Sequence, residues 1–329
     1  MKLLKSIYFF LALCSISLQI QAQSEVVRFA NIGHGYYAGP LYVAVRENLF
    51  QKYGLTPEIT TAQGGPLVFQ AVFTRQADFG IVSYEHILTA AGQGRRLVSI
   101  FNVTSRPINN IIVSNKLFDS DGKKPIKERI LALKGKRIGV PSAGGSGEKI
   151  LGSLAMKYGL QIPGDIELVY LGPDANTYVG AFKNNLIDAA VPFEPAGVQV
   201  EKEKLGKIYV NLMNGEVEEF RDLNYMDLIT SPATIAEKPE LTKKMVAIFA
   251  EAQKILLNEA KGKAIMAKEF PNLSPEVNDR AYAVVKQIWS PDGKMSIEGG
   301  KKVFDYLQPK QDKPINFPQT FTNQFLPSQ

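Results

Sequence analysis

The 329-residue sequence contains one cysteine, Cys14, and two histidines, His34 and His86. Cys14 lies in an apolar N-terminal segment that we expect to be removed. A chain without this cysteine has no disulfide, no thiolate nucleophile and no cysteine-based metal site. Two isolated histidines are too few to indicate a metal centre, and no other pattern indicates a bound cofactor. We therefore expect neither a metal nor a cofactor.

Long hydrophobic runs are missing after the N-terminus. Residues 1–22 combine Lys2 and Lys5 with an apolar run over 7–18 and small residues near Ala22, which is typical of a secretory signal peptide. No later segment is apolar for the ~20 residues that a membrane span needs. We expect cleavage after Ala22 and a periplasmic mature protein. Lipidation at Cys14 is the lesser alternative, because Leu13 precedes it where lipoprotein signals prefer a small residue.

No region of the sequence concentrates charge of one sign. Lysine and arginine total 38 against 32 aspartates and glutamates, a formal net charge of +6, and the basic residues are scattered. Nucleic-acid binding is not expected, because no basic cluster is interleaved with aromatics. No GxSxG elbow with a partner aspartate and histidine is visible either, so the sequence favours a binding function over an enzymatic one.

Short β-branched runs alternate with helical patterns, which predicts α/β lobes with mostly parallel sheets flanked by helices. The predicted strands are 26–32, 57–61, 78–82, 97–103, 110–114, 137–140, 167–171, 188–191 and 226–230. The predicted helices are 41–53, 66–74, one ending at 130, 147–158, 177–184, 239–258, 261–270 and 275–288. The length suggests about two domains. The proline-rich tail from Gln308 is expected to pack as an irregular strap.

Two segments of the chain resemble each other. Residues 58–85 read EITTAQGGPLVFQAVFTRQADFGIVSYE, and residues 167–194 read ELVYLGPDANTYVGAFKNNLIDAAVPFE. Each has a strand, a glycine-containing loop, an alanine-aromatic helix and an aspartate, Asp78 or Asp188, that opens the next strand. We expect two lobes of related construction, with chance similarity of two strand-helix-strand units as the alternative. The two aspartates are expected to bond to backbone rather than to ligand.

A glycine- and serine-rich turn joins a strand to a helix within residues 136–158, which read KRIGVPSAGGSGEKILGSLAMKY. Backbone N–H groups at a helix start lack intrahelical acceptors, and glycines let a ligand approach them, so the turn could bind an anionic group. It matches neither a P-loop nor a dinucleotide fingerprint. The alternative is that the glycines only make a tight turn.

Ligands of open α/β sheets bind beyond the carboxyl ends of the strands. Six loops follow strands in this chain, and we expect them to line one cleft if the lobes face each other. These loops are 33–40, 62–66 and 83–85 from one lobe, and 142–147, 172–176 and 192–195 from the other.

Four of these regions resemble the periplasmic substrate-binding proteins of ABC importers, in the branch that covers nitrate, sulfonate, taurine and thiamine-pyrimidine binders. The similar segments are GHGYYAGPLYVAVRENLFQKYGL (33–55), TAQGGPLVFQAVFTRQADFGI (61–81), LKGKRIGVPSAGGSGEKIL (133–151) and IDAAVPFEPAG (187–197). The resemblance implies a two-lobed type II fold that captures its ligand by hinge closure. It implies a signal peptide (1–22), lobe 1 (23–107 and 226–329) and lobe 2 (108–225), with crossover strands near 106–111 and 225–231. It also implies a monomer that delivers a small molecule to a membrane permease.

The resemblance also implies a set of ligand-binding residues. They are Tyr36, Tyr37 and Gly39; Gly64 and Gly65; Ser83, Tyr84 and Glu85; Ala143, Gly144, Gly145, Ser146 and Gly147; and Phe193 and Glu194. Aromatic rings would form a flat wall, helix-start N–H groups would bind oxygens, and carboxylates would accept hydrogen bonds. Two alternatives stay open: Tyr36 and Tyr37 could be packing aromatics, and Glu194 could cap the helix that follows it.

The two glutamates bear on the charge of the ligand. A simple anion facing Glu85 and Glu194 would meet like-charge repulsion. The sequence therefore favours an organic ligand that carries hydrogen-bond donors, such as a pyrimidine-type vitamin precursor or an aminosulfonate zwitterion. Other interpretations are an enzyme on the same fold, of the thiamine-pyrimidine synthase or menaquinone-pathway kind, and a ligand-sensing subunit of a membrane receptor. The predicted signal peptide and the missing cysteine-rich motif argue against the enzymes.

Overall fold

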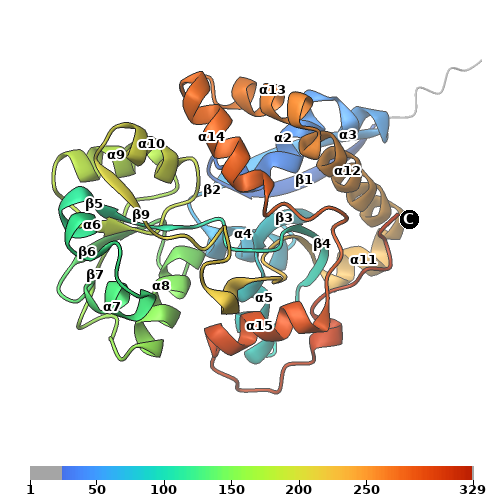
Figure 1. The fold of residues 1–329 in the computed structure, drawn as a ribbon. Coiled ribbons are helices and arrows are strands. Elements are labelled where there is room, and N and C mark those ends of the chain that lie inside the picture. Colours follow the sequence, from blue (N-terminus) through green and yellow to red (C-terminus); the bar gives the residue numbers. More distant parts are fainter. Residues whose placement is uncertain (1–23, 328–329) are drawn as a thin grey trace, which may run out of the picture.

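The computed structural model describes residues 24–327, in which two five-stranded sheets are each flanked by helices (Figure 1). We call the part built on the first sheet lobe 1 and the part built on the second sheet lobe 2. The predicted signal peptide and Cys14 lie outside the described residues. Within residues 24–327, no helix is both long and apolar enough to span a bilayer.

Lobe 1 has the strand order β2-β1-β3-β10-β4, in which only β10 runs antiparallel to its neighbours. The strands are β1 (Glu25–Ile32), β2 (Leu55–Ala62), β3 (Phe79–Ser83), β4 (Val98–Thr104) and β10 (Met226–Thr230). The helices are η1 (Tyr36–Ala38), α2 (Gly39–Arg46), α3 (Leu49–Lys52), α4 (Gly65–Phe73), α5 (Tyr84–Gly92), α11 (Pro232–Glu237), α12 (Pro239–Leu257), α13 (Glu259–Glu269), α14 (Pro275–Lys286), α15 (Ile297–Leu307) and η3 (Phe317–Gln319).

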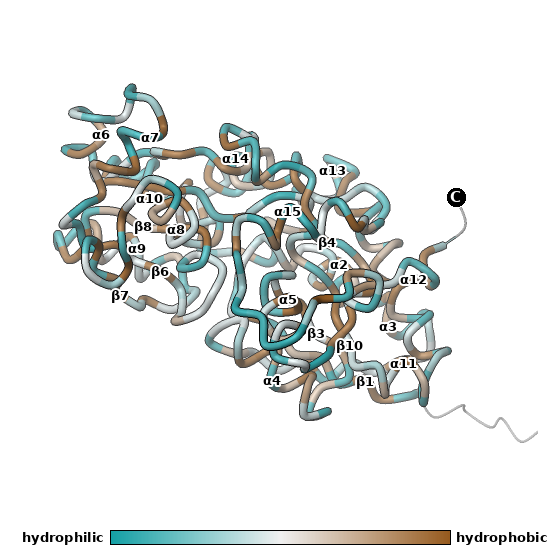
Figure 2. Tube along the Cα trace, turned by 90° about the horizontal axis from the view of Figure 1, so that it is seen from below, coloured by the Kyte–Doolittle hydropathy of each residue, from teal (hydrophilic) through white to brown (hydrophobic). Residues whose placement is uncertain are grey.

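Lobe 2 repeats this plan with the order β7-β6-β8-β5-β9, and its antiparallel strand, β5, again stands fourth. The strands are β5 (Ile111–Ser114), β6 (Arg137–Val140), β7 (Glu167–Tyr170), β8 (Ala189–Ala190) and β9 (Gly206–Val210). The helices are α6 (Asn115–Asp121), α7 (Ile126–Leu131), α8 (Ser146–Lys157), α9 (Ala175–Lys183) and α10 (Ala196–Lys202); η2 (Glu218–Phe220) lies in the return to lobe 1. Figure 2 shows lobe 2 at one end of the molecule and β1, α11 and α12 at the other.

Helices cover both faces of the lobe 1 sheet. On one face, Phe249 of α12 stacks on Phe29 of β1 with ring centroids 5.9 Å apart. On the other face, α4 packs so closely on β3 that a Cβ at Gly80 would lie 2.8 Å from Val68 Cγ1. Burial of these apolar faces is the main driving force for assembling the layers.

The predicted mixed α/β fold with two mostly parallel sheets is confirmed, and so is the strand-helix-strand form of both similar segments, β2-α4-β3 and β7-α9-β8. The predicted helix 41–53 is wrong as a single helix. Asn48 adopts a left-handed conformation (φ 54°), which ends α2 and starts α3. The predicted loop 83–85 is also wrong, because β3 passes directly into α5 at Tyr84. The short elements α5, α10, α11, α15 and β9 were not predicted.

The chain passes between the lobes twice, at residues 105–110 and 211–225. The first crossing agrees with the prediction near 106–111. The second prediction, 225–231, is wrong, because residues 226–230 form β10 between β3 and β4 in the lobe 1 sheet. The crossings contact each other: the Arg106 guanidinium donates to the Met213 carbonyl (3.1 Å), and Leu223 N donates to the Ser105 carbonyl (2.8 Å).

The C-terminal tail packs as the irregular strap that the sequence predicts. It runs along the edge strand β4, where Ser99 N donates to the Thr320 carbonyl and Thr322 N donates to the Ser99 carbonyl (3.0 and 2.9 Å). A sheet edge exposes unpaired backbone groups, and the strap supplies partners for some of them.

Asp78 and Asp188 occupy equivalent places in the two lobes and bond to backbone, as predicted. Asp78 accepts from Arg28 N (3.0 Å), and Asp188 accepts from Arg137 N (2.9 Å). In return, each aspartate N–H donates to the carbonyl of the same arginine (2.8 Å). Each aspartate thereby joins two neighbouring parallel strands at the edge opposite the cleft loops.

The Asp78 carboxylate is the more buried of the two, with 6% of its side chain exposed against 36% for Asp188. Burial alone would raise the pKa of Asp78, but hydrogen bonds from the Arg28 side chain and backbone bring it below its ordinary value. We expect Asp78→Ala to lower the free energy of unfolding by about 2–3 kcal/mol. The substitution leaves the backbone N–H and the guanidinium of Arg28 without their acceptor. Urea denaturation should show a smaller loss for Asp188→Ala; an equal loss would contradict the role of burial.

Candidate functional site

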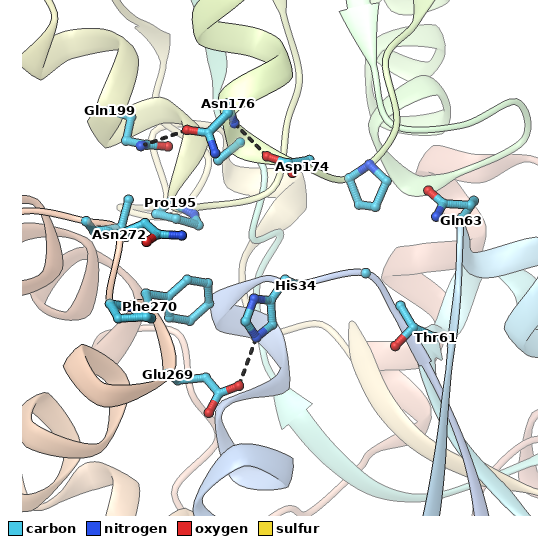
Figure 3. Close-up of a pocket in the computed structure, with 15 residues that line it drawn as sticks. His34, Thr61, Gln63, Asp174, Asn176, Pro195, Gln199, Glu269, Phe270 and Asn272 are labelled. Carbon is cyan, nitrogen blue, oxygen red and sulfur yellow. Dashed lines mark hydrogen bonds and ion pairs between the residues drawn. The ribbon is translucent and has the colours of Figure 1, made fainter.

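A cavity of about 560 Å³ opens between the two lobes (Figure 3). We call it the interlobe cavity. Lobe 1 contributes Gly33, His34, Thr61, Gln63, Glu269, Phe270, Pro271, Asn272 and Leu273; lobe 2 contributes Pro173, Asp174, Ala175, Asn176, Pro195 and Gln199. Four of the six predicted cleft loops therefore reach it, namely 33–40, 62–66, 172–176 and 192–195. Loops 83–85 and 142–147 do not line it.

One wall of the cavity is an aromatic and charged group from lobe 1. The His34 ring stacks on Phe270 with centroids 4.8 Å apart. Glu269 Oε1 lies 2.8 Å from His34 Nε2, and its Oε2 accepts from Arg46 Nε at 2.7 Å. The hydrogen bond from His34 lowers the pKa of Glu269, and Arg46 adds to this effect. Glu269 therefore stays ionised with both oxygens occupied.

The opposite wall comes from the starts of α9 and α10 in lobe 2. Asp174 caps α9 by accepting from Asn176 N (2.8 Å). Gln199 Nε2 donates to Asn176 Oδ1 at 3.5 Å, whereas the buried Gln199 Oε1 has no protein partner within the described residues. We call the amides of Asn176 and Gln199 the amide row; Figure 3 shows it facing Phe270 and His34 across the cavity.

The sequence did not predict the segment 269–273, which connects α13 to α14. It lies more than 230 residues from the first cleft loop and packs beside it only because the chain returns to lobe 1. The only signal in the sequence is a short proline-containing turn between two helical patterns, and such turns are common at protein surfaces.

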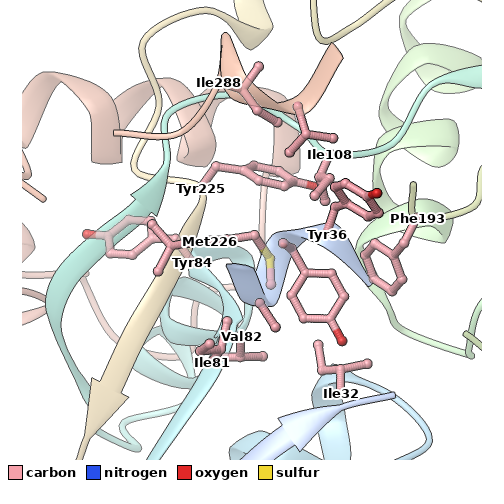
Figure 4. Close-up of a cluster of buried hydrophobic side chains, with 14 of the residues drawn as sticks. Ile32, Tyr36, Ile81, Val82, Tyr84, Ile108, Phe193, Tyr225, Met226 and Ile288 are labelled. Atoms are coloured by element: carbon pink, nitrogen blue, oxygen red, sulfur yellow. The ribbon is translucent and has the colours of Figure 1, made fainter. Parts of the chain in front are cut away.

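The predicted aromatic residues lie in the contact between the lobes rather than on the cavity wall. Tyr36 N donates to the Glu194 carbonyl (3.1 Å), and the Tyr37 and Phe193 rings are 5.1 Å apart. The Tyr36 hydroxyl donates to Asn278 Oδ1 at 2.8 Å. Figure 4 shows Tyr36 and Phe193 within a cluster of buried apolar side chains. Both tyrosines are fully buried, so they pack in this arrangement.

The predicted glycines also lie at close contacts. Gly39 starts α2, where a Cβ would lie 2.6 Å from Leu256 Cδ2 of α12. A Cβ at Gly64 would lie 2.5 Å from Ser142 Oγ across the lobe contact. Gly65 lies next to it, where a Cβ would be 2.4 Å from His86 Nε2.

The glycine-serine turn of lobe 2 bonds mainly to the protein itself. Gly144 N donates to the Glu148 carboxylate (3.0 Å), and Ser146 Oγ lies 3.4 Å from Asn109 Oδ1. A Cβ at Gly147 would lie 2.5 Å from the Val191 carbonyl, and one at Gly145 would lie 2.6 Å from Ser142 Oγ. Ala143 is exposed in the turn. Ligand binding by this turn stays a prediction.

The side chains of the predicted third loop bond within lobe 1. Glu85 is fully buried and accepts from the hydroxyls of Ser83 (2.9 Å) and Tyr306 (2.7 Å). Burial raises its pKa, although Lys149 offsets part of this effect. The Tyr84 hydroxyl bonds to Thr320 of the strap, away from the interlobe cavity.

Glu194 has the capping role that the sequence left open. Its Oε2 accepts from Val198 N of α10 at 3.1 Å. Burial raises the pKa of Glu194 to about 7, and the hydrogen bond from Val198 offsets only part of the effect. Neither Glu85 nor Glu194 lines the interlobe cavity, so the repulsion expected between these carboxylates and an anion is not a feature of that cavity.

A smaller cavity of about 320 Å³ lies at the other end of the lobe contact, lined in part by Pro66, His86, Gly144 and Lys149. Lys149 Nζ lies 3.4 Å from His86 Nδ1. Burial lowers the pKa of His86 well below its ordinary value, and the positive charge of Lys149 lowers it further. His86 is therefore neutral here and accepts from the ammonium group.

Ion pairs also join the lobes outside the interlobe cavity. Lys202 of α10 pairs with Glu276 of α14. Glu201 of α10 pairs with Arg280 of α14, so here the acidic residue belongs to lobe 2. Because α14 follows directly on the cavity segment 269–273, these pairs hold that wall of the cavity against lobe 2.

The chain is similar to a described protein family and to proteins that are named as binding proteins. A family model described as "NMT1/THI5 like" matches residues 36–261. A Brucella abortus protein named as a candidate binding protein is 26% identical over 244 residues, which cover 74% of this chain and 70% of that protein.

Two solved structures share the fold. A structure from Bordetella bronchiseptica RB50 has a TM-score of 0.81 and 23% identity, covering 92% of this chain and 96% of the other. The alkanesulfonate-binding protein SsuA from Xanthomonas axonopodis pv. citri, bound to MOPS, has a TM-score of 0.70 and 19% identity, covering 92% and 99%. The fold expected from the resemblance is therefore confirmed.

Proposed function

Because the chain belongs to the NMT1/THI5-like family, we propose that it is the solute-binding component of an ABC importer, which captures a small polar organic molecule in the interlobe cavity. The observation that carries this proposal is that both lobes build the cavity, so a solute bound there contacts lobe 1 and lobe 2 at once. Such a solute binds more tightly when the lobes touch than when they are separated. This difference in affinity stabilises the arrangement in which the lobes touch.

The two crossing segments, 105–110 and 211–225, are the natural hinge. They bond to each other and contribute no residue to the cavity lining, so a change in their backbone angles would separate the lobes and open the cavity. After closure, the joined surfaces of both lobes would present the loaded protein to a membrane permease. Export to the periplasm through the N-terminal segment and a monomeric state belong to the same proposal.

The groups around the cavity suit binding better than bond chemistry. Among the described residues, no lysine, serine or cysteine lines it, and the carboxylates of Asp174 and Glu269 have protein partners. A nucleophilic mechanism needs an activated nucleophile next to a base, and this wall offers hydroxyl, amide and aromatic groups instead.

Native mass spectrometry of the protein expressed and exported from its natural gene tests the proposal. We expect a species with a releasable small molecule that vanishes on partial unfolding and refolding. A double variant, Gln63→Ala with Asn272→Ala, should bind the released molecule about 10–100-fold more weakly, since each exposed amide contributes about one hydrogen bond.

Gln51→Ala is the matched control, because it removes an exposed amide of lobe 1 on α3, outside the cavity lining. Equal affinity of the double variant and the control would contradict the cavity as the binding site. Conversion of the released molecule into a product by the wild-type protein would favour an enzyme on this fold.

A further inference from the structure

The interlobe cavity has few groups that could hold an anion. Of residues 24–327, the charged or titratable ones that line it are His34, Asp174 and Glu269. Arg46 does not belong to the cavity lining, and its charge is paired with Glu269: Nε donates to Glu269, and Nη2 donates to the Lys268 carbonyl at 2.9 Å. Among the described residues no lysine or arginine lines the cavity, so an entering anion would find neither of these cations to pair with.

Helix starts could replace a cation, and three of them surround the cavity, those of α9, α10 and α14. Each is already capped by the protein. Asp174 accepts from Asn176 N, Glu194 accepts from Val198 N at 3.1 Å, and Ser274 Oγ accepts from Val277 N at 3.3 Å. Two of the three caps are carboxyl groups, which occupy an N–H group and, when ionised, also oppose the positive end of the helix dipole.

The groups that remain available are neutral. Within the described residues, the Thr61 hydroxyl and the amides of Gln63 and Asn272 line the cavity without a protein hydrogen bond. These hydroxyl and amide groups can accept from N–H or O–H groups of a solute and can donate to its acceptors. The His34 ring, with 56% of its side chain exposed, adds a flat surface.

From these observations we infer that the interlobe cavity takes an uncharged solute that has a planar face and several N–H or O–H groups, and that it discriminates against carboxylates, sulfonates and nitrate. This inference rests on the proposed solute-binding function and specifies its ligand class. Figure 3 shows the two elements of the recognition, the stacked Phe270 and His34 on one side and the amide row on the other.

An isosteric pair of probes tests the charge preference: nicotinamide and nicotinate, which differ by one amide against one carboxylate. Titration of each probe up to millimolar concentrations into isotopically labelled protein, followed by two-dimensional NMR, should perturb the backbone signals of residues 33–34 and 174–176. We expect nicotinamide to bind at least tenfold more tightly than nicotinate. Gln63→Arg should reverse the order by adding an unpaired cation, whereas Gln51→Arg on the outer surface should leave it unchanged.

Tighter binding of nicotinate, or perturbation of the same signals by sodium nitrate or methanesulfonate, would overturn the ligand class while leaving the solute-binding function standing. Absence of any perturbation by nicotinamide would also count against the proposed ligand class. The mass shift in native mass spectrometry reports on the binding function separately, so the two failures are distinguishable.

Discussion

Replacing Gly33 with alanine is expected to weaken solute binding by about 100-fold or more. Gly33 follows β1 and lines the interlobe cavity, and a Cβ there would lie 2.3 Å from Pro173 Cγ and 2.7 Å from Pro173 Cβ in lobe 2. A proline ring cannot rotate out of the way, so the lobes would stop short of the contact seen here. A 100-fold loss corresponds to about 2.8 kcal/mol, a modest cost for such an overlap.

The same substitution strains the backbone, because Gly33 has a φ of +25°. This strain is present whether or not the lobes touch, so it should lower stability without changing affinity. Gly135→Ala is the matched control: Gly135 has a φ of +71°, and a Cβ there would have no atom within 4 Å. We expect the control to lose stability but to keep its affinity.

Isothermal titration with the solute released from the wild-type protein measures the affinity, and small-angle X-ray scattering measures the separation of the lobes. The Gly33→Ala protein should stay expanded when solute is added. Adding Pro173→Gly should restore part of the affinity by removing the ring. Wild-type affinity in Gly33→Ala, or no rescue by Pro173→Gly, would contradict closure at this contact.

The second large effect is expected at Asp227, a fully buried carboxyl on the antiparallel strand β10. It lies opposite Val82 of β3 and Asn102 of β4. Burial raises the pKa of Asp227 to about 8, and the nearby Ser99 hydroxyl offsets only part of this effect. At neutral pH the carboxyl is therefore mostly protonated and has an O–H to donate, while the buried Asn102 Oδ1 has no donor within the described residues.

This pKa makes stability depend on pH in a definite direction. The carboxyl of an unfolded chain titrates near pH 3.9, so the folded protein binds the proton more tightly. The stabilisation is fully present below about pH 4, falls as the pH rises, and is lost above about pH 8. Four pH units correspond to about 5 kcal/mol as an upper bound.

Urea denaturation of the wild-type protein and of Asp227→Asn at pH 5, 7 and 9 measures this effect. The amide stays neutral, so the variant should lose less stability than the wild-type protein between pH 5 and pH 9. Glu194, with a pKa of about 7, and Glu85, whose pKa is also raised, contribute with the same sign in both proteins. Parallel pH profiles for the two proteins would show that Asp227 is not protonated in the fold.

Much of the architecture could be predicted because it depends on local pattern. Strands such as Glu25–Ile32 and Met226–Thr230 are short apolar runs bounded by turn residues, and the two aspartates recur at the same place in two similar segments. The elements that were missed are held by tertiary contacts. Helix α5 begins without a side-chain cap directly at the end of β3, so no local signal separates it from the strand.

The candidate site was predicted less completely than the fold. The sequence placed four loops correctly at the cavity, because the carboxyl ends of parallel strands lie along one edge of each sheet. It could not show that Tyr37 and Phe193 meet across the lobes, that Glu85 bonds to Tyr306 more than 200 residues away, or that Phe270 faces His34.

The sequence by itself therefore determined the class of fold, the family and the sheet edge at which the candidate site lies. Periodicity, turn residues and segment order are properties of neighbouring residues, and they survive in a linear chain. Only the tertiary structure decided which side chains are free to meet a solute and which are used by the protein. That choice depends on distances between groups remote in sequence and on burial, which sets both hydrogen-bond partners and pKa values.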